Sequence, residues 1–453
     1  MRKLEQITFL SIIFIIIVAF NFQHNPLSNW YQQYLPNIYT QQINDITFID
    51  SLTGFIVTSR NVNPDTATIL KTTNGGDNWI VVFNQPSRRF STIKLINDST
   101  GFVCGGTGTG LPFLYKTTNT GQNWATVPIL NTQFIDDMEV LNSDTIWLAD
   151  GDALVGGVYS TTNGGLNWTR QLSVGSYNPD VLYMYDKNFG FASKGSSQRI
   201  YRTTNGGESW DIVANQYMDD IQFANSLTGW RSNDQDRDSS IRKTTDGGLT
   251  WVKQILPGGS AFYGTVMKSF SMINKDTLWG VGGTIIAAPG RYKAVIYKTT
   301  NGGNNWGYQI PDTSFNIGIL ERMDFLDKNH GWAYANYSPP KGVHTTTGGD
   351  SITYYTGIQQ ISNIVPDNLK LEQNYPNPFN PVTNIRYSLK KPGFVSLRIF
   401  NVQGKEISNL VNQKQQAGEY QYSFEAVNLS SGIYFYTLQT ENFSETKKMM
   451  LIK

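Results

Sequence analysis

Short segments with alternating apolar and polar residues recur along most of the chain, and turns rich in Gly, Asn and Asp separate them. The segments STIKLIN, TGFVCGG and PFLYKTT, which begin at Ser91, Thr100 and Pro112, show the two-residue period of strands rather than the 3.6-residue period of helices. Asn-Gly-Gly between two such segments predicts a hairpin, since Gly tolerates positive φ. The pattern therefore predicts an all-β protein.

One nine-residue segment that ends in Trp recurs six times. The copies are KTTNGGDNW from Lys71, KTTNTGQNW from Lys116, STTNGGLNW from Ser160, RTTNGGESW from Arg202, KTTDGGLTW from Lys243 and KTTNGGNNW from Lys298. Successive Trp residues are 45, 44, 42, 41 and 55 positions apart, so each unit has room for four short strands. A unit of this size is typical of a propeller blade.

A second recurring segment lies between these copies and joins an apolar strand to a polar turn and then to an aromatic residue. Its seven copies begin at Ile46, Ile93, Met138, Leu182, Ile221, Phe270 and Met323. Ten of the eleven Trp residues fall in the two segments, and the eleventh is Trp30. Since one blade cannot bury its apolar faces alone, stacked blades are expected.

The two ends of the repeat region complement each other. The seventh unit continues through Thr345 to Asp350 without a following Trp, whereas Asn29 and Trp30 open the stretch NWYQQYLP, which is similar to NWIVVFNQP after Gly76 and Asp77. We expect this N-terminal strand to complete the last unit. Residues 29–350 would then form a seven-bladed β-propeller whose closure removes open sheet edges.

The N-terminus has the features of an export signal. Arg2 and Lys3 precede an almost wholly apolar run from Ile7 to Phe20, which polar residues follow. This order predicts a secretory signal peptide over residues 1–25, with cleavage before Asn29. A retained membrane anchor is the alternative, although the run is shorter than the ~20 residues that a spanning helix needs. After cleavage we expect no stable membrane span.

The composition changes after Asp350. Residues 351–370 lack the repeat and are interpreted as a linker. Residues 371–453 contain about seven strands, which Pro-Asn, Gln-Gly and Ser-Ser-Gly turns separate. This length and pattern predict a small antiparallel, Ig-like β-sandwich.

Charge and cysteine content exclude several classes of function. With 36 basic and 35 acidic residues the net charge is +1, which excludes the basic field of a nucleic-acid-binding protein. Cys104 is the single cysteine, so an internal disulfide and a Cys-based zinc site are excluded. It lies in an apolar strand and is expected to be a buried, inert thiol. With three His residues in all, we predict no metal, no cofactor and no catalytic residue.

Two sets of residues are candidates for chemistry. Asp136, Asp137, Asp219 and Asp220 open the innermost strands of their units and could supply the paired carboxylates of a glycoside hydrolase, or they are solvated turn acids. Asp234, Asp236 and Asp238 resemble the start of a calcium loop. However, Ser239 and Thr245 stand where such a loop has Gly and Glu, which favours a solvated loop.

Exposed aromatic side chains are a third candidate feature. Tyr183, Tyr185 and Tyr334 could stack on sugar rings, although packing between strands is the simpler role for each.

The recurring pattern Ser/Thr-x-Asp/Asn-x-Gly-x-x-Trp resembles the Asp-box, or BNR repeat, and the whole unit resembles the Ycf48-like and sortilin-like propellers over about Asn29 to Asp350. The resemblance implies that the box is a structural turn. In this reading the Asn74 side chain bonds backbone amides, Gly76 shapes the turn and Trp79 packs between strands. Sialidases also carry such boxes, but the Phe-Arg-Ile-Pro motif that accompanies their first Arg is absent.

The C-terminal segment resembles a second family. NYPNPFNP, NVQGKEI, LSSGIYFYTL and the final KKMMLIK look like a type A sorting domain of the type IX secretion system over residues 371–453. The resemblance implies a Bacteroidota-like bacterium, the secretion machinery as a partner, and a location outside the cell or on the outer-membrane surface. A plain adhesive sandwich is the alternative.

These features favour a secreted or cell-surface propeller that binds a glycan or a protein without catalysing a reaction. The alternatives are a secreted glycoside hydrolase of the Asp-box type and a Ycf48-like assembly or scaffold factor. A fold of this kind does not itself decide between them.

Overall fold

The structure is a computed structural model. It describes residues 29–36, 38, 41–59, 66–107, 111–129, 134–151, 156–173, 179–194, 198–233, 241–258, 262–288, 291–336, 341–354, 358–362, 365–426 and 429–453. The predicted signal peptide and the three aspartates that resemble the start of a calcium loop lie outside these residues.

The described residues before Ile358 form seven antiparallel sheets, which we number in chain order. Sheet 1 contains β2 (Ile43–Phe48), β3 (Gly54–Thr58), β4 (Thr66–Thr72) and β5 (Ile80–Pro86). Sheet 2 contains β6 (Arg88–Leu95), β7 (Gly101–Thr107), β8 (Pro112–Thr117) and β9 (Ala125–Val127). Sheet 3 contains β10 (Asp137–Val140), β11 (Ile146–Asp150), β12 (Gly157–Thr161) and β13 (Thr169–Leu172).

The remaining four sheets continue the same order. Sheet 4 contains β14 (Val181–Met184), β15 (Gly190–Lys194), β16 (Arg199–Thr203) and β17 (Asp211–Ala214), and sheet 5 contains β18 (Asp220–Phe223), β19 (Gly229–Ser232), β20 (Ile241–Thr244) and β21 (Val252–Gln254). Sheet 6 is larger, with β22 (Phe262–Gly264), β23 (Ser269–Met272), β24 (Leu278–Ala288), β25 (Arg291–Thr299), β26 (Gly307–Gln309) and β30 (Thr353–Tyr354). Sheet 7 contains β27 (Arg322–Phe325), β28 (Gly331–Tyr334), β29 (Lys341–Thr345) and β1 (Tyr31–Tyr34), and the short 3₁₀ turn η2 (Thr313–Phe315) precedes it.

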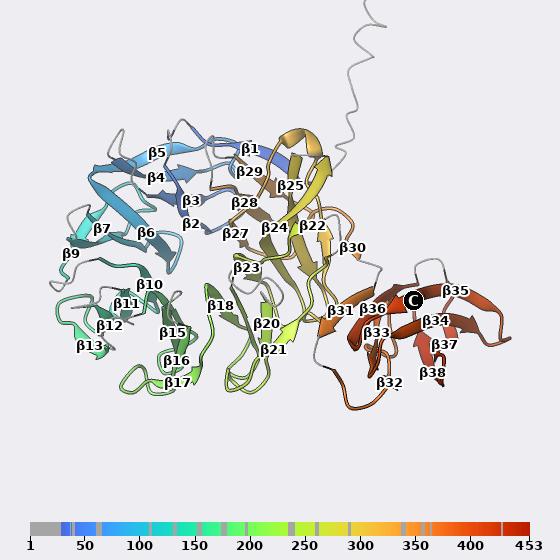
Figure 1. Cartoon of the computed structure of the whole chain (residues 1–453). Helices are drawn as coiled ribbons and strands as arrows, with labels where there is room; N and C mark the ends of the chain where they lie inside the picture. Colours follow the sequence, from blue (N-terminus) through green and yellow to red (C-terminus); the bar gives the residue numbers. More distant parts are fainter. Residues whose placement is uncertain are drawn as a thin grey trace, which may run out of the picture.

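The seven sheets stand side by side around a common axis (Figure 1). The strands nearest the axis are β2, β6, β10, β14, β18, β23 and β27, and each contacts the next around the ring, including β27 with β2. Separate apolar clusters fill the spaces between neighbouring sheets, as the cluster of Trp30, Trp279 and Phe325 does between sheets 6 and 7. The arrangement is that of a β-propeller, and the all-β prediction is confirmed.

Sheet 7 combines strands from the two ends of the ring. β1 pairs antiparallel with β29, and Tyr31 lies opposite His344. The backbone N–H of Asn29 donates to the Asp350 carboxylate. The indole of Trp30, which is 1% exposed, donates to Gln309 Oε1 at 3.1 Å. Asn29 and Trp30 thus occupy the place that Asn78 and Trp79 occupy in the first repeat.

The Asp-box turns have the structural role that the resemblance implied. In the first box, Thr72 Oγ1 accepts from the Gly76 N–H at 2.8 Å and Asn74 Oδ1 accepts from the Asn78 N–H at 2.9 Å. Gly75 and Gly76 adopt φ of 70° and 91°, which favours glycine. The Gly75 N–H also donates to the Leu52 carbonyl, so the box lies beside the turn between the first two strands of its own sheet. The other boxes repeat this bond to the neighbouring turn.

Two sheets form the C-terminal domain. One contains β31 (Ile358–Ser362), β36 (Gly418–Glu425), β33 (Val382–Leu389) and β32 (Lys370–Leu371). The other contains β35 (Glu406–Gln415), β34 (Gly393–Asn401), β37 (Gly432–Thr440) and β38 (Phe443–Leu451). Their inner faces enclose a core that includes Ile385, Leu397, Tyr436 and Met449.

The segment 351–370 differs from the expected linker. It contains β30, which pairs with β26 of sheet 6, and β31, which pairs with β36 of the C-terminal domain. Both are short edge strands, and neither continues a repeat. Each forms by hydrogen bonding to the edge of an existing sheet, β30 to β26 and β31 to β36. An unpaired strand edge has free backbone N–H and C=O groups, which favour the addition of a strand.

We predict that His344 makes the closing sheet sensitive to acid. Its ring stacks on Trp332, with centroids 4.9 Å apart, and burial lowers its pKa from 6.5 to about 4. The unfolded chain therefore takes up this proton at a higher pH than the folded protein does. The contribution to stability is full above pH 6.5 and is lost as the pH falls towards 4.

The variant His344→Phe keeps an aromatic ring on Trp332 but cannot be protonated. Its melting temperature should fall less between pH 7 and pH 5 than that of the wild type, as scanning calorimetry would measure. Equal shifts in both proteins would contradict the prediction.

Candidate functional site

A polar cavity of about 790 Å³ lies where the innermost strands begin. Its lining includes residues of all seven sheets, from Asp45 of sheet 1 to Arg322 of sheet 7. The Asp-box turns follow the third strand of each sheet and lie beside the turn that ends the first strand. They are therefore at the opposite face of the ring from the cavity.

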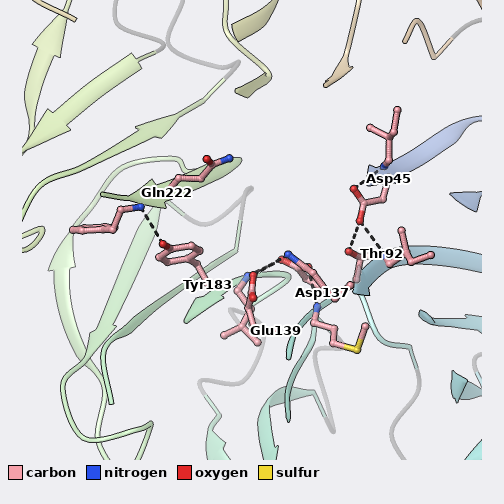
Figure 2. A network of polar contacts seen from close by, with 12 residues as sticks. Asp45, Thr92, Asp137, Glu139, Tyr183 and Gln222 are labelled. Atoms are coloured by element: carbon pink, nitrogen blue, oxygen red, sulfur yellow. Dashed lines mark hydrogen bonds and ion pairs between the residues drawn. The ribbon is translucent and has the colours of Figure 1, made fainter. Parts of the chain in front are cut away.

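Side chains at the axis bridge each inner strand to the next. Asp45 Oδ2 of β2 accepts from Thr92 Oγ1 at 2.6 Å and from the Ile93 N–H of β6 at 3.0 Å. Asp137 Oδ2 of β10 accepts from the Leu182 N–H of β14 at 2.9 Å. Figure 2 shows both carboxylates directed along the ring towards the neighbouring strand.

The same kind of bridge joins the other sheets. At four more junctions, a side-chain oxygen of one inner strand accepts a hydrogen bond from a backbone N–H of the next inner strand. The acceptor and donor residues are Tyr183 and Phe223 at 3.0 Å, Asp220 and Phe270 at 3.0 Å, Ser271 and Phe325 at 3.0 Å, and Asp324 and Phe48 at 2.7 Å. Between sheets 2 and 3 the bridge is an ion pair of Lys94 with Glu139 at 2.9 Å (Figure 2). Every junction around the ring thus contains a polar bridge.

A ring of charged residues lies one position before the inner strands and faces the cavity. In five sheets the backbone N–H of this residue donates to a carbonyl of the second strand, which makes the positions structurally equivalent. They are Asp136, Asp180, Asp219, Lys268 and Glu321, in sheets 3 to 7. Three carboxylates therefore follow one another along one arc of the cavity.

The opposite arc carries the cations. Lys268 forms an ion pair with Glu321, which is largely buried. Arg322 donates to the Asn44 carbonyl across the junction of sheets 7 and 1. Arg89 of sheet 2 stacks over Phe134, with 5.1 Å from its guanidinium carbon to the ring centroid. The cavity thus has an acidic side at sheets 3 to 5 and a mixed side elsewhere.

Loss of hydration inside the ring raises the pKa of several carboxyl groups. It raises the pKa of Asp137 to about 7, with Lys94 opposing the shift and Glu139 adding to it. It raises the pKa of Asp136, Asp220 and Asp324 to about 6 each. Partial burial lowers the pKa of Lys94, but Glu139, Asp137 and Asp45 together hold it well above its usual range. Lys94 therefore stays charged and stabilises the ionised form of its neighbours.

The four acids that the sequence singled out all line this cavity. Asp137 and Asp220 begin β10 and β18, as predicted, but they are neither solvated turn acids nor freely available, because both accept backbone N–H bonds from the next sheet. Asp136 accepts from the Gly151 N–H at 3.0 Å. Sequence reasoning missed Asp180, Lys268 and Glu321. Aligning the repeats on their first apolar strand would have found these residues, since each stands just before that strand.

Of the candidate tyrosines, Tyr334 and Tyr183 pack between strands, whereas Tyr185 is 38% exposed. Tyr334 is fully buried, donates to Gln33 and accepts from the Trp79 indole at 3.0 Å. Tyr183 lines the cavity, but its ring stacks on Phe223 with centroids 6.1 Å apart. Tyr185 follows β14 and packs its edge against Phe189. Cys104 is buried, as predicted, and burial raises the pKa of its thiol well above its usual value.

Two family models match different parts of the chain. The photosystem II assembly factor YCF48 family matches residues 23–207, and the secretion system C-terminal sorting domain family matches residues 373–453. The chain joins a Ycf48-like propeller region to a type IX secretion sorting domain. The sorting domain implies secretion or a cell-surface location.

Solved structures are similar to the Ycf48-like region in fold. A structure of YCF48 bound to D1 peptide is 17% identical with a TM-score of 0.53, and the match covers 72% of this chain and 98% of that one. The GH74 xyloglucanase from Xanthomonas campestris is 12% identical with a TM-score of 0.46, and the match covers 79% of this chain and 59% of that one. No curated protein matches the chain. Within the described part, no helix has the length and apolar character to cross a membrane.

We predict that Asp137 lowers stability as the pH rises. Its folded pKa of about 7 lies above the usual 3.8, so its stabilising effect is full below pH 3.8 and is lost as the pH approaches 7. Asp137→Asn keeps the acceptor oxygen for the Leu182 N–H and removes the titration. Between these pH values, the unfolding free energy of the variant should rise relative to wild type by up to about 1.4 kcal/mol per pH unit.

Urea unfolding at pH 4 to 8 would measure this difference. Asp98→Asn, at an exposed turn on the other face, is the matched control and should show no such trend. A pH-independent difference for Asp137→Asn would refute the assignment.

Proposed function

We propose that the protein is a secreted or cell-surface binding protein. In this proposal residues 1–25 are a signal peptide, residues 29–350 form a closed ring of seven blades, and residues 371–453 carry the ring through the type IX secretion machinery. The ring binds its ligand at the cavity and catalyses no reaction. The support is the combination of the sorting domain with a polar cavity on the face opposite the Asp-box turns.

The charge of the cavity favours a cationic ligand. Eight carboxyl groups and four cations line it, and the carboxyl groups include the successive Asp136, Asp180 and Asp219. Burial raises the pKa of Asp136, Asp137 and Asp220, so dehydration disfavours the ionised form of these carboxyl groups. A ligand that brings a Lys or Arg side chain to this arc would supply positive charge that favours the ionised form.

A protein segment fits this cavity better than a stacked sugar does. Tyr183 is the one aromatic residue among the described lining residues, and Phe223 covers its ring. The YCF48 structure holds a peptide, which supports a peptide ligand for a similar fold. We infer that the ligand is an exposed, basic segment of a protein outside the cell.

Binding to an array of soluble peptides that vary in Lys and Arg content would test this function. We expect the protein to prefer basic peptides, with affinity that falls as salt rises and increases from pH 5 to pH 8 as the carboxyl groups ionise. Asp180→Asn combined with Asp219→Asn should weaken binding about tenfold, which corresponds to about 1.4 kcal/mol. Asp98→Asn is the control and should bind as the wild type does. Binding that ignores peptide charge would refute the proposal.

Glycan binding is a second candidate, and a specific feature of sheet 6 favours it. The hairpin of β24 and β25 is the longest in the ring and continues past the cavity-lining Ser269. A bulge in β22 displaces Tyr263 from register, so that its ring lies 4.6 Å from that of Tyr292. Tyr263 is 68% exposed and Tyr292 40% exposed. Open aromatic faces of this kind can stack on sugar rings.

A polysaccharide array would test the second candidate. Saturable binding that Tyr263→Ala and Tyr292→Ala abolish, and that Tyr375→Ala in the sorting domain leaves intact, would support it. Any polysaccharide that binds should then be assayed for sugar release, which tests the hydrolase alternative. Absence of binding by folded protein would reject the glycan candidate and leave the peptide proposal untouched.

A further inference from the structure

The sorting domain contacts the sixth Asp-box of the ring. Asn384 Nδ2 of β33 donates to the Asn304 carbonyl at 2.8 Å and also bonds the side-chain oxygen of Asn305. Asn305 Nδ2 in turn donates to the Val382 carbonyl at 3.3 Å. Asn305 is 5% exposed and Asn384 9% exposed, so this amide network is shielded from water.

This contact distinguishes the sixth box from the others. The residues equivalent to Asn305 in the first three boxes are Asn78, Asn123 and Asn167, and all three are exposed. Their backbone N–H groups make the same bond within the box as that of Asn305. What differs at Asn305 is the use of its side chain, which faces the sorting domain.

The connecting chain also attaches to sheet 6. After leaving sheet 7 it forms β30, in which Thr353 and Tyr354 lie opposite Tyr308 and Gly307 of β26. β31 then joins the sorting domain by pairing with β36. The domain is thus held at the outer edge of sheet 6, beside β30, the strand that pairs with β26 (Figure 1).

Gln309, the last residue of β26, links this edge to the strand that closes the ring. Its Oε1 accepts from the Trp30 indole at 3.1 Å. Its Nε2 donates to the Gly348 carbonyl at 3.3 Å and to the Asp350 carbonyl. Asp350 itself accepts from the Asn29 N–H. The path of the chain from Asp350 into β30 therefore depends on Asn29 and Trp30 being in place.

We propose that ring closure and docking of the sorting domain are coupled. The edge of sheet 6, formed by Asn304, Asn305 and β26, is a docking surface, and its occupant is the sorting domain of the same chain. Closure by Asn29 to Tyr34 fixes Gln309 and Asp350 and so orders this surface. In an open ring the connecting chain loses its anchor and the sorting domain separates from sheet 6. The sorting domain thereby adopts one orientation only on a completed ring.

A distance measurement between the two domains in the full chain tests this coupling. One spin label is attached at Val252→Cys on β21 and the other at Val402→Cys in the sorting domain. The native residues are 68% and 65% exposed. Pulsed electron paramagnetic resonance then measures the distance between the two labels. Cys104 is fully buried and does not compete for the label. We expect one narrow distance peak in the otherwise unchanged protein. A broad distribution there would refute docking.

Three variants in this labelled background separate the two parts of the proposal. Asn384→Ala should replace the narrow peak with a broad distribution while the thermal unfolding of the ring stays unchanged. Gln309→Ala should also lose the narrow peak. Gln171→Ala is the matched control. Gln171 Nε2 donates to the Gly206 carbonyl of another box at 2.8 Å, as Gln309 Nε2 does to the Gly348 carbonyl, but it lies away from the strand that closes the ring.

The control should keep the narrow peak. A narrow peak in Asn384→Ala would overturn the docking surface, and identical distributions in Gln309→Ala and Gln171→Ala would overturn the coupling. Circular dichroism of each variant confirms that it is folded. If Gln309→Ala does not fold, Asp350→Ala tests the same link from its other side.

Discussion

The hydrogen bond from a backbone N–H of one inner strand to a side chain of the preceding inner strand is the interaction on which the ring depends. Neighbouring sheets share no strand ladder at the axis, so only side chains can register one sheet against the next. Asp45, Asp137, Asp220 and Asp324 do this with a carboxylate, because a charged acceptor makes a stronger bond than a neutral one. The same choice places negative charge at the axis, where water is scarce.

Stability and the proposed ligand chemistry therefore reside in one set of residues. The carboxyl groups that register the sheets are partly dehydrated, which raises their pKa, and Lys94 compensates for only some of them. In the proposed function, a cationic ligand adds positive charge at the mouth of the cavity. His344 acts in the opposite direction at the closing sheet, since its buried ring resists protonation. Between pH 4 and pH 6.5, His344 therefore adds stability as the pH rises, whereas Asp137 removes it.

The fold could be predicted from the sequence because its signals are repeated. Thr, Asn or Asp, Gly and Trp recur at fixed offsets in the six boxes that end in Trp, and the structure shows the local roles of Thr72, Asn74 and Gly76. The site could be predicted only in part. Asp136 and Asp219 stand out as paired acids, whereas Asp180 and Lys268 stand out only when the repeats are aligned on their first apolar strand. β30 and β31 escaped prediction because two- to five-residue edge strands depend on a partner and not on their own pattern.

The seventh box is split between Asn29 and Asp350, and this split affects the order in which the propeller can fold during synthesis. The two residues are 321 positions apart, so β1 is synthesised long before β29, the strand it pairs with. During that interval sheet 7 has no partner for β1, and contacts of such large separation form slowly. The nascent propeller is thus an open arc with two uncapped edges until its last repeat has emerged.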